Sequence, residues 1–134
     1  LKQADPLRTA QAVLARLPAG DVFFWSWNAD WLKRIRAAFP AARLMARAED
    51  FDTLDACLSA FRPDIVEFNP GNADRDAFGK VHAAGRRVMI AYTGDDSDEV
   101  DRLLRLGPDL INVNAPFLVA RRLAAADNQE RQGA

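Results

Sequence analysis

The chain has 134 residues, of which 49% are hydrophobic and 28% charged, and its 18 basic and 19 acidic residues leave a formal net charge of −1. This composition is typical of one globular domain, and the near-neutral charge argues against broad binding to nucleic acid. Cys57 is the only cysteine, which excludes an internal disulfide and a cysteine-based metal cluster.

No run of apolar residues reaches the roughly 18 that a membrane span needs, and no basic-then-apolar leader opens the chain. We therefore expect no membrane span, and a cytoplasmic location is the default expectation. Cys57 lies in an apolar helical stretch, so we expect it to be a buried thiol that packs as a small hydrophobe.

Runs rich in β-branched or aromatic residues predict five strands, separated by segments with helical apolar spacing. In chain order, the strands are expected at Val22–Trp27, Ala42–Met45, Asp64–Phe68, Arg87–Tyr92 and Leu110–Val113. Pro6 is placed to open a helix before the first strand, and Asn28 is placed to cap the helix that follows this strand.

The later segments carry their own helix signals. Helical spacing predicts a helix over residues 51–61, and another that Ser97 caps and Gly107 follows. Asp95, Asp96 and Asp98 lie beside this cap, where they could help to collect a cation. Acidic residues at this position more often cap a helix, and we favour that role.

Alternating strands and helices imply parallel strands joined by helical crossovers, and therefore an α/β fold. Ligands bind at the C-terminal ends of such strands. Alternation along the strands turns Val66 and Ile111 toward the helices and turns Glu67, Asn112 and Asn114 the other way. Polar residues repeated on one face fit the interior of a barrel better than an open sheet, whose two faces are both apolar.

Three segments match family patterns in the right order. Residues 85–93 resemble G-x-x-V-x-x-W-T-V-N, and residues 107–116 resemble G-V-D-G-I-I-T-D-x-P. The third segment is Ser26-Trp27-Asn28, which is similar to the family pattern S-F-D. The family has L, R and P after this pattern, and here a Leu, an Arg and a Pro follow at residues 32, 36 and 40. These are patterns of the glycerophosphodiester phosphodiesterases. The resemblance implies a partial TIM barrel over residues 1–123, containing strands four to eight. Residues 124–134 are small and polar, and we expect them to form a flexible tail.

The resemblance also implies a function. The chain would be the C-terminal portion of a protein that hydrolyses glycerophosphodiesters to glycerol 3-phosphate and an alcohol. A missing N-terminal segment or a second chain would have to complete the barrel. A divalent metal, Mg²⁺ or Ca²⁺, is implied, with ligands outside this chain. The small-molecule phosphodiester would contact residues at the strand ends, and the candidates are Lys2, Ser26, Trp27, Glu67, Ala91, Asn112 and Asn114.

The chain also departs from the family. Ala91 stands where the family has its active-site Trp, Tyr92 replaces Thr, and Gly94 replaces Asn. The family's H-R-G motif, E-x-D pair and second catalytic His belong to the first part of the barrel. The only histidine is His82, which lies in a predicted crossover helix and is expected at the surface or in helix packing.

Two alternatives stay open. The first is a noncatalytic, degenerate barrel domain that binds a ligand or a protein partner, which the replaced Trp and Thr favour. The second is a flavodoxin-like receiver domain, which the chain length suits. A receiver needs an acidic pair after its first strand, however, and Ser26-Trp27-Asn28 stands there.

Overall fold

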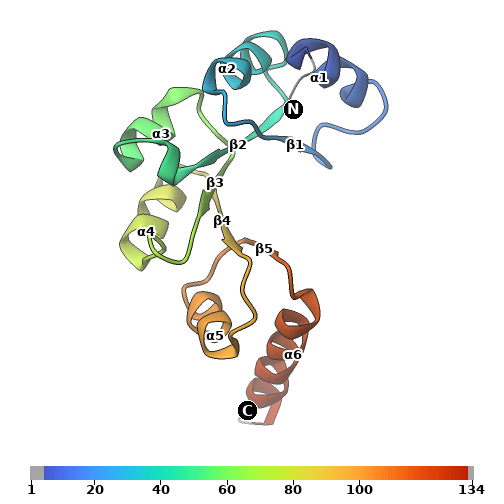
Figure 1. Ribbon diagram of the computed structural model, residues 1–134. Helices are drawn as coiled ribbons and strands as arrows, with labels where there is room; N and C mark the ends of the chain where they lie inside the picture. Colours follow the sequence, from blue (N-terminus) through green and yellow to red (C-terminus); the bar gives the residue numbers. More distant parts are fainter. Residues whose placement is uncertain (1–4, 133–134) are drawn as a thin grey trace.

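The structure is a computed structural model that describes residues 5–132, and the side chains of residues 5–125. Helices and strands alternate along the chain (Figure 1). The elements are α1 (Pro6–Leu14), β1 (Phe23–Phe24), α2 (Ala29–Ala38), β2 (Arg43–Arg47), the 3-10 helix η1 (Ala48–Asp50), α3 (Leu54–Ala60), β3 (Ile65–Phe68), α4 (Arg75–Ala83), β4 (Arg87–Tyr92), α5 (Ser97–Arg105), β5 (Leu110–Val113) and α6 (Pro116–Gln132). Within residues 5–132, no helix has the length and apolar character needed to cross a membrane.

The five strands form one parallel sheet in the order β1-β2-β3-β4-β5. The sheet curls into part of a barrel, with the helices on its outer side (Figure 1). This confirms the expected α/β, partial TIM-barrel fold. The receiver alternative is wrong, because a flavodoxin-like sheet has the order 2-1-3-4-5, whereas here each strand pairs with the next in sequence.

The predicted strands are all present, and β4 and β5 have the predicted bounds. The ends of the others are shifted: β1 is only Phe23–Phe24, β2 is Arg43–Arg47, and β3 begins at Ile65. Asn28 caps α2 as expected, but Asp96, not Ser97, caps α5. The Asp96 carboxylate accepts hydrogen bonds from the backbone N–H groups of Asp98 and Glu99, at 2.8 and 3.3 Å. The favoured role of this acidic run in capping is therefore confirmed.

The C-terminal segment is helical where the sequence predicted a tail. Helix α6 continues from Pro116 to Gln132, so residues 124–132 extend the last helix. The expected boundary after residue 123 therefore falls inside a helix and does not mark the end of secondary structure. A flexible tail beginning at residue 124 stays a prediction.

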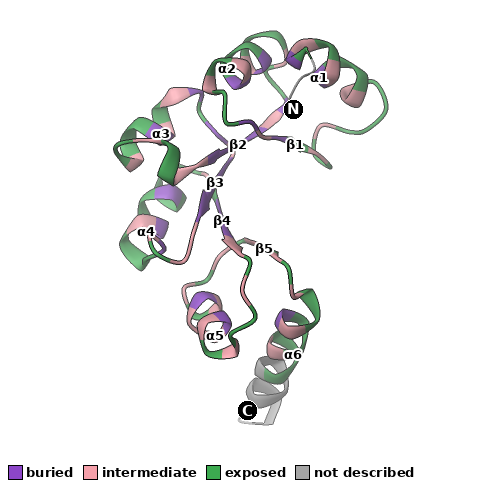
Figure 2. Ribbon diagram, in the orientation of Figure 1, coloured by how far each residue is buried: buried purple, intermediate pink, exposed green. Residues whose placement is uncertain are grey.

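The main core lies between the sheet and the outer helices (Figure 2). Val66, Phe68, Val88 and Ile90 point from β3 and β4 into this core and are at most 3% exposed. Cys57 is fully buried in the same core, and burial raises the pKa of its thiol to about 12. The expectation that Cys57 serves packing is confirmed.

The opposite face of the sheet carries a second, smaller apolar cluster. Met45, Ile65 and Met89 are buried there, with Trp25 and Leu110 packed against them. Among the described side chains, the large hydrophobic residues that remain exposed lie near β1 or on α6, at the two ends of the curved sheet. They are Leu17, Phe23, Trp27, Phe117 and Leu123.

Candidate functional site

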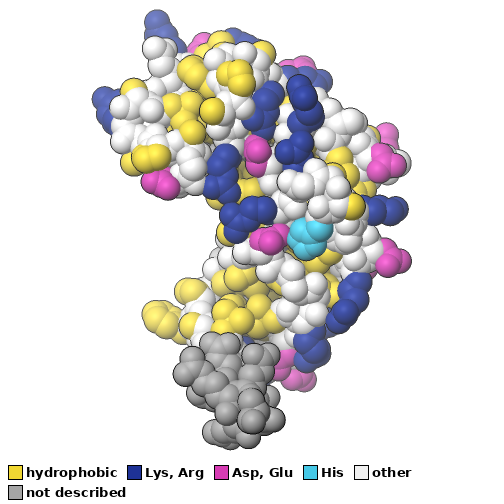
Figure 3. Space-filling model, turned by 180° about the vertical axis from the view of Figure 1, so that it is seen from behind, with side chains coloured by type: hydrophobic (Ala, Val, Ile, Leu, Met, Phe, Trp, Pro, Cys, Tyr) yellow, Lys and Arg dark blue, Asp and Glu magenta, His cyan; other side chains and the backbone are white. Residues whose placement is uncertain are grey.

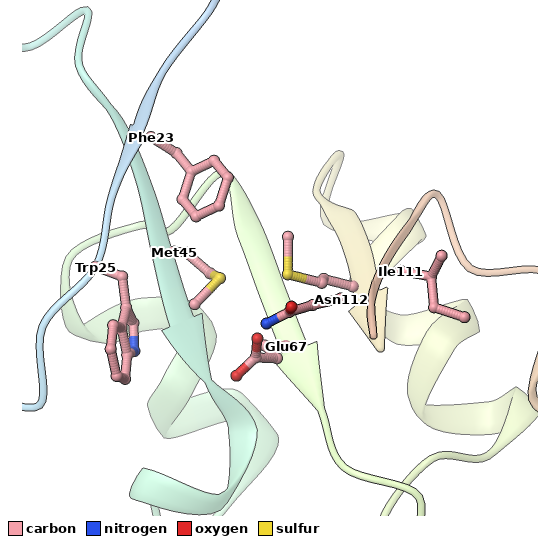
Figure 4. Close-up of a pocket in the computed structure, with 7 residues that line it drawn as sticks. Phe23, Trp25, Met45, Glu67, Ile111 and Asn112 are labelled. Atoms are coloured by element: carbon pink, nitrogen blue, oxygen red, sulfur yellow. The ribbon is translucent and has the colours of Figure 1, made fainter. Parts of the chain in front are cut away.

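Glu67 and Asn112 meet at the C-terminal ends of the strands, on the inner face of the sheet. Glu67 lies near the end of β3 and is 8% exposed, while Asn112 comes from β5. The Asn112 side chain lies beside the Glu67 carboxylate, across the intervening strand β4 (Figure 4), close enough to help lower the pKa of that carboxyl. The sequence expectation that both residues turn away from the outer helices is therefore confirmed.

A cavity of about 390 Å³ opens beside this pair (Figure 4). Its walls are mainly aromatic and aliphatic, and Glu67 and Asn112 are its polar groups. The lining residues are Phe23, Trp25, Met45, Glu67, Met89, Ile111 and Asn112. The indole Nε1 of Trp25 is buried and has no hydrogen-bond partner among the described residues. An apolar hollow with a few polar groups is the usual form of a small-molecule site.

Arg47 joins the site from the end of β2. Its Nε lies 3.6 Å from Oε1 of Glu67, its Nη1 lies 3.9 Å from the carboxylate of Asp50, and it also pairs with Glu49. Asn69 donates a side-chain hydrogen bond to Glu49. The Arg47 guanidinium therefore lies among three carboxylates at the rim of the cavity. One positive charge does not neutralise three carboxylates, so the rim is acidic.

The pKa of Glu67 reflects this mixed environment. Burial has the largest influence and raises the pKa above its usual range, and Asp50 raises it further. Arg47 and the Asn112 side chain act in the opposite direction without reversing the shift. Glu67 therefore takes up a proton more readily than an exposed glutamate does.

Two of the other candidate residues, Ala91 and Asn114, lie near the Glu67–Asn112 pair, at or just beyond the ends of β4 and β5. Ala91 lies beside Asn112 in the β4–β5 register. The side chain of Asn114 donates to the carbonyl oxygen of Thr93, at 3.4 Å, in the loop after β4. Lys2 lies outside the described residues.

Ser26 and Trp27 line a separate hollow of about 60 Å³, which Arg47 and Asp50 border. The Ser26 hydroxyl accepts a hydrogen bond from the Asn28 N–H at 3.1 Å, so it helps to shape the turn before α2. Trp27 is 57% exposed and packs edge-on against Trp25, with ring centroids 4.5 Å apart. Trp25 packs against the inner apolar cluster and also lines the main cavity.

Arg47, Glu49, Met45 and Met89 are not among the site residues that the sequence predicts. Alternation along β2 carried a usable signal, because Met45 and Arg47 share a face in the same way as Glu67 and Asn69 do. The partners of Arg47 could not be read from the sequence, since Glu67 lies 20 residues away.

Tyr92 and Gly94, two of the residues that depart from the family pattern, are packed against each other. The Tyr92 ring lies so close to Gly94 that a Cβ on that residue would overlap the phenol. The Tyr92 hydroxyl also accepts a hydrogen bond from the Asp96 N–H at 3.2 Å. Tyr92 in place of Thr therefore goes together with Gly94 in place of Asn, and the loop here has its own shape.

The described residues do not by themselves fit the divalent metal that the family resemblance implies. The carboxylates at the rim already surround the Arg47 guanidinium, and residues 5–125 contain no group of three or more His, Cys, Asp or Glu side chains arranged to hold an ion. His82 lies at the other end of the strands, where its Nε2 is 2.9 Å from Oδ2 of Asp109. Its expected place away from the strand C-termini is confirmed.

Comparison with known proteins finds similarity in structure only. No family model matches the chain, and no curated protein matches it. A glycerophosphodiester phosphodiesterase from Agrobacterium tumefaciens superposes with a TM-score of 0.78 at 22% identity, over 88% of this chain and 51% of its own. One from Parabacteroides distasonis gives 0.77 at 15% identity, over 91% and 51%.

A phosphodiesterase from Oleispira antarctica, solved with the product sn-glycerol-3-phosphate, gives a TM-score of 0.64 at 17% identity, over 76% of this chain and 41% of its own. The chain thus spans about half the length of these structures. At such low identity the similarity establishes the fold alone: this chain folds as part of a parallel α/β barrel and superposes on roughly half of these structures.

Proposed function

We propose that this chain is the C-terminal portion of a phosphodiesterase that hydrolyses glycerophosphodiesters to glycerol 3-phosphate and an alcohol. The observation that carries the proposal is the Glu67–Asn112 pair beside an apolar cavity at the strand C-termini. The motif resemblance at the ends of β4 and β5, together with the fold, favours this substrate class over other ligands of α/β barrels.

The proposal gives the residues of this chain a substrate-side role. The apolar walls of the cavity contact carbon atoms of the glycerol or alcohol group, and the Asn112 amide donates to a phosphate oxygen. Glu67 is less repulsive toward a phosphodiester anion because its raised pKa favours the neutral form. The catalytic histidines and the metal ligands belong to polypeptide outside this chain.

The proposal requires a partner for the open sheet. Within residues 5–132, the five strands leave one edge of β1 and one edge of β5 unpaired, whereas a TIM barrel closes with eight strands. The exposed Phe23 near one end and Phe117 near the other, 44% and 85% exposed, support a partner that reaches both ends. A further segment with parallel strands, in the same polypeptide or a second one, meets this need.

The test is an assay of the full-length protein that contains this chain. Glycerol 3-phosphate release from glycerophosphoethanolamine is measured with Mg²⁺, with Ca²⁺ and with EDTA. We expect metal-dependent release, and a decrease in kcat/KM of about tenfold or more in Asn112→Ala, since a hydrogen bond to a charged group is worth about 1.5–3 kcal/mol. Arg121→Gln, on the exposed part of α6, is the control and should be unchanged.

One observation favours the second candidate, a noncatalytic barrel domain that binds a ligand. Tyr92 and Gly94 give the loop after β4 its own shape, and Ala91 stands where the resembled family has a Trp. If the full-length protein binds a glycerophosphodiester without releasing glycerol 3-phosphate under any metal condition, this second function replaces the first. A cytoplasmic location stays a prediction.

A further inference from the structure

A basic groove lies at the opposite end of the strands from the candidate site. It consists of two adjoining hollows, of about 570 and about 370 Å³, that share Arg36, Pro40 and Arg62. Lys33 lines the first hollow, while Asp64 and Arg86 line the second. Seen from behind, Lys and Arg side chains form a band across this face, next to the single histidine (Figure 3).

All the side-chain N–H donors of Arg36 are used in hydrogen bonds within the protein, and these bonds fix the shape of the groove. Its guanidinium donates to four backbone carbonyl oxygens and to the Asp64 carboxylate, which uses all five of its N–H donors. The acceptors are the carbonyl oxygens of Pro40 (2.8 Å), Ala42 (2.8 Å), Phe61 (3.3 Å) and Arg62 (3.0 Å), and Oδ2 of Asp64 (2.5 Å). Arg36 and Asp64 also cancel each other's charge.

Arg62 and Arg86 are left with positive charge that no neighbour offsets. Neither guanidinium has a hydrogen bond or an ion pair with any of the described residues, and both line the same hollow of about 370 Å³. Lys33, at the edge of the groove, is 3.0 Å from the Asp30 carboxylate and is thereby partly neutralised. The chain as a whole has a net charge of −1, so two guanidinium groups without a paired anion in one hollow form a local concentration of positive charge.

The backbone of Arg62 is a second, independent observation. Its φ of 50° lies in the left-handed region, and among the described residues it is the only one other than glycine with a positive φ. Gly85 and Gly107 occupy the same place, two residues after the ends of α4 and α5, with φ of 70° and 75°. An arginine at a position that favours glycine costs stability, and such strain is concentrated at functional sites.

We propose that Arg62 and Arg86 form a binding site for a phosphate monoester dianion, separate from the candidate site at the strand C-termini. A phosphate monoester carries about −1.5 to −2 charges near pH 7, which matches the two free guanidinium groups. Arginine also binds phosphate oxygens through paired N–H donors. All the groups that build this site belong to this chain, so the proposal does not depend on how the barrel is completed.

The test measures phosphate binding by the full-length protein. Inorganic phosphate is titrated by calorimetry at constant ionic strength, with sodium chloride as the reference. We expect saturable binding that weakens about tenfold or more in Arg62→Gly and in Arg86→Gln, as expected for the loss of one charge-assisted hydrogen-bonding group. Arg121→Gln removes the same charge from α6 and should bind like the wild type.

The source of the phosphate group is tested in a second arm. Co-sedimentation with phosphatidylcholine vesicles, with and without phosphatidic acid, shows whether a lipid headgroup is bound. Phosphate binding in solution, or phosphatidic acid-dependent sedimentation that both variants lose, supports the site. The proposal is overturned if the wild type responds to neither, or if both variants respond as the wild type does. Circular dichroism confirms that the variants are folded.

Discussion

Asp64 and Asp109 occupy equivalent positions in two strand pairs of the sheet, β2–β3 and β4–β5. Each precedes a strand and follows a proline, and each binds the preceding strand twice through its own backbone N–H and its carboxylate. Asp64 contacts Leu44 O and N at 2.8 and 2.9 Å, and Asp109 contacts Val88 O and N at 3.0 and 2.7 Å. A side chain from the helix that precedes both strands completes each cluster: Arg36 of α2 contacts Asp64, and His82 of α4 contacts Asp109.

Replacing Asp109 with Asn should destabilise the protein in a pH-dependent way. Burial raises the pKa of Asp109, but the hydrogen bonds from the Val88 N–H and from His82 outweigh it and hold the pKa below its usual range. The carboxylate therefore stabilises the fold above the unfolded-state pKa, near 3.9, and this contribution is lost as the pH falls through the lower folded-state pKa.

We expect Asp109→Asn to lower the free energy of unfolding by about 1 kcal/mol at pH 7, because a hydrogen bond to a charged carboxylate is replaced by a weaker one to a neutral amide. Urea unfolding at pH 7, 5 and 3 measures it. The difference from the wild type should shrink toward pH 3, and a difference that stays constant over this range would contradict the assigned role of the charge.

Arg62→Gly should stabilise the protein, whereas Gly85→Ala should destabilise it. Both residues follow a helix with a positive φ, of 50° and 70° respectively. A side chain in this conformation costs about 1–2 kcal/mol, partly offset because glycine has more freedom in the unfolded chain. The net effect should be about 0.5–1 kcal/mol in opposite directions, measured by urea unfolding at pH 7. Equal losses in both variants would show that the Arg62 side chain supports the fold.

Cys57 should resist thiol reagents in the folded protein. It is fully buried, and burial raises the pKa of its thiol to about 12, so the reactive thiolate is scarce at pH 8. We expect modification by a disulfide reagent only in urea, at a rate limited by unfolding. Cys57→Ser should cost about 1–3 kcal/mol, because it buries a hydroxyl group, and more than Cys57→Ala does. Rapid labelling in native buffer would place the thiol at the surface.

The fold could be predicted further from the sequence than the site could. Strand alternation correctly separated Val66 from Glu67 and placed Asn112 with Glu67, because side-chain direction in a strand depends on local geometry alone. The sequence did not show that Arg47 would sit among Glu49, Asp50 and Glu67. That cluster depends on how the ends of β2 and β3 meet, and charged side chains at strand ends have no periodicity that reveals their partners.

The helix caps show the same limit on a smaller scale. Asn28 stood alone before its helix and was identified correctly, whereas Ser97 and Asp96 competed for one position. Both side chains can accept hydrogen bonds from backbone N–H groups, and the backbone conformation decided between them. The strained φ of Arg62 had no sequence signal, because only the comparison with Gly85 and Gly107 in three dimensions shows that these residues are equivalent.

Glu67→Gln should become more stable relative to the wild type as the pH rises. Burial, the largest influence, raises the pKa of Glu67 in the folded state above its unfolded value, near 4.3. Wild-type stability is therefore complete below the unfolded-state pKa, and part of it is lost as the pH rises through the folded-state pKa. Glutamine does not ionise, so the difference between variant and wild type should grow across this window and then level off.

Glu99→Gln is the matched control, because it makes the same chemical change with the opposite expected sign. The hydrogen bond from Arg102 lowers the pKa of Glu99, so ionisation of this residue favours the folded state. The Glu99 variant should therefore lose stability relative to the wild type as the pH rises past about 4, while the Glu67 variant gains it. Urea unfolding from pH 3.5 to 8 separates the two. Parallel curves for both variants would mean that the folded state lowers the pKa of Glu67 as it lowers that of Glu99, and the neutral form of Glu67 would then have no part in binding a phosphodiester anion.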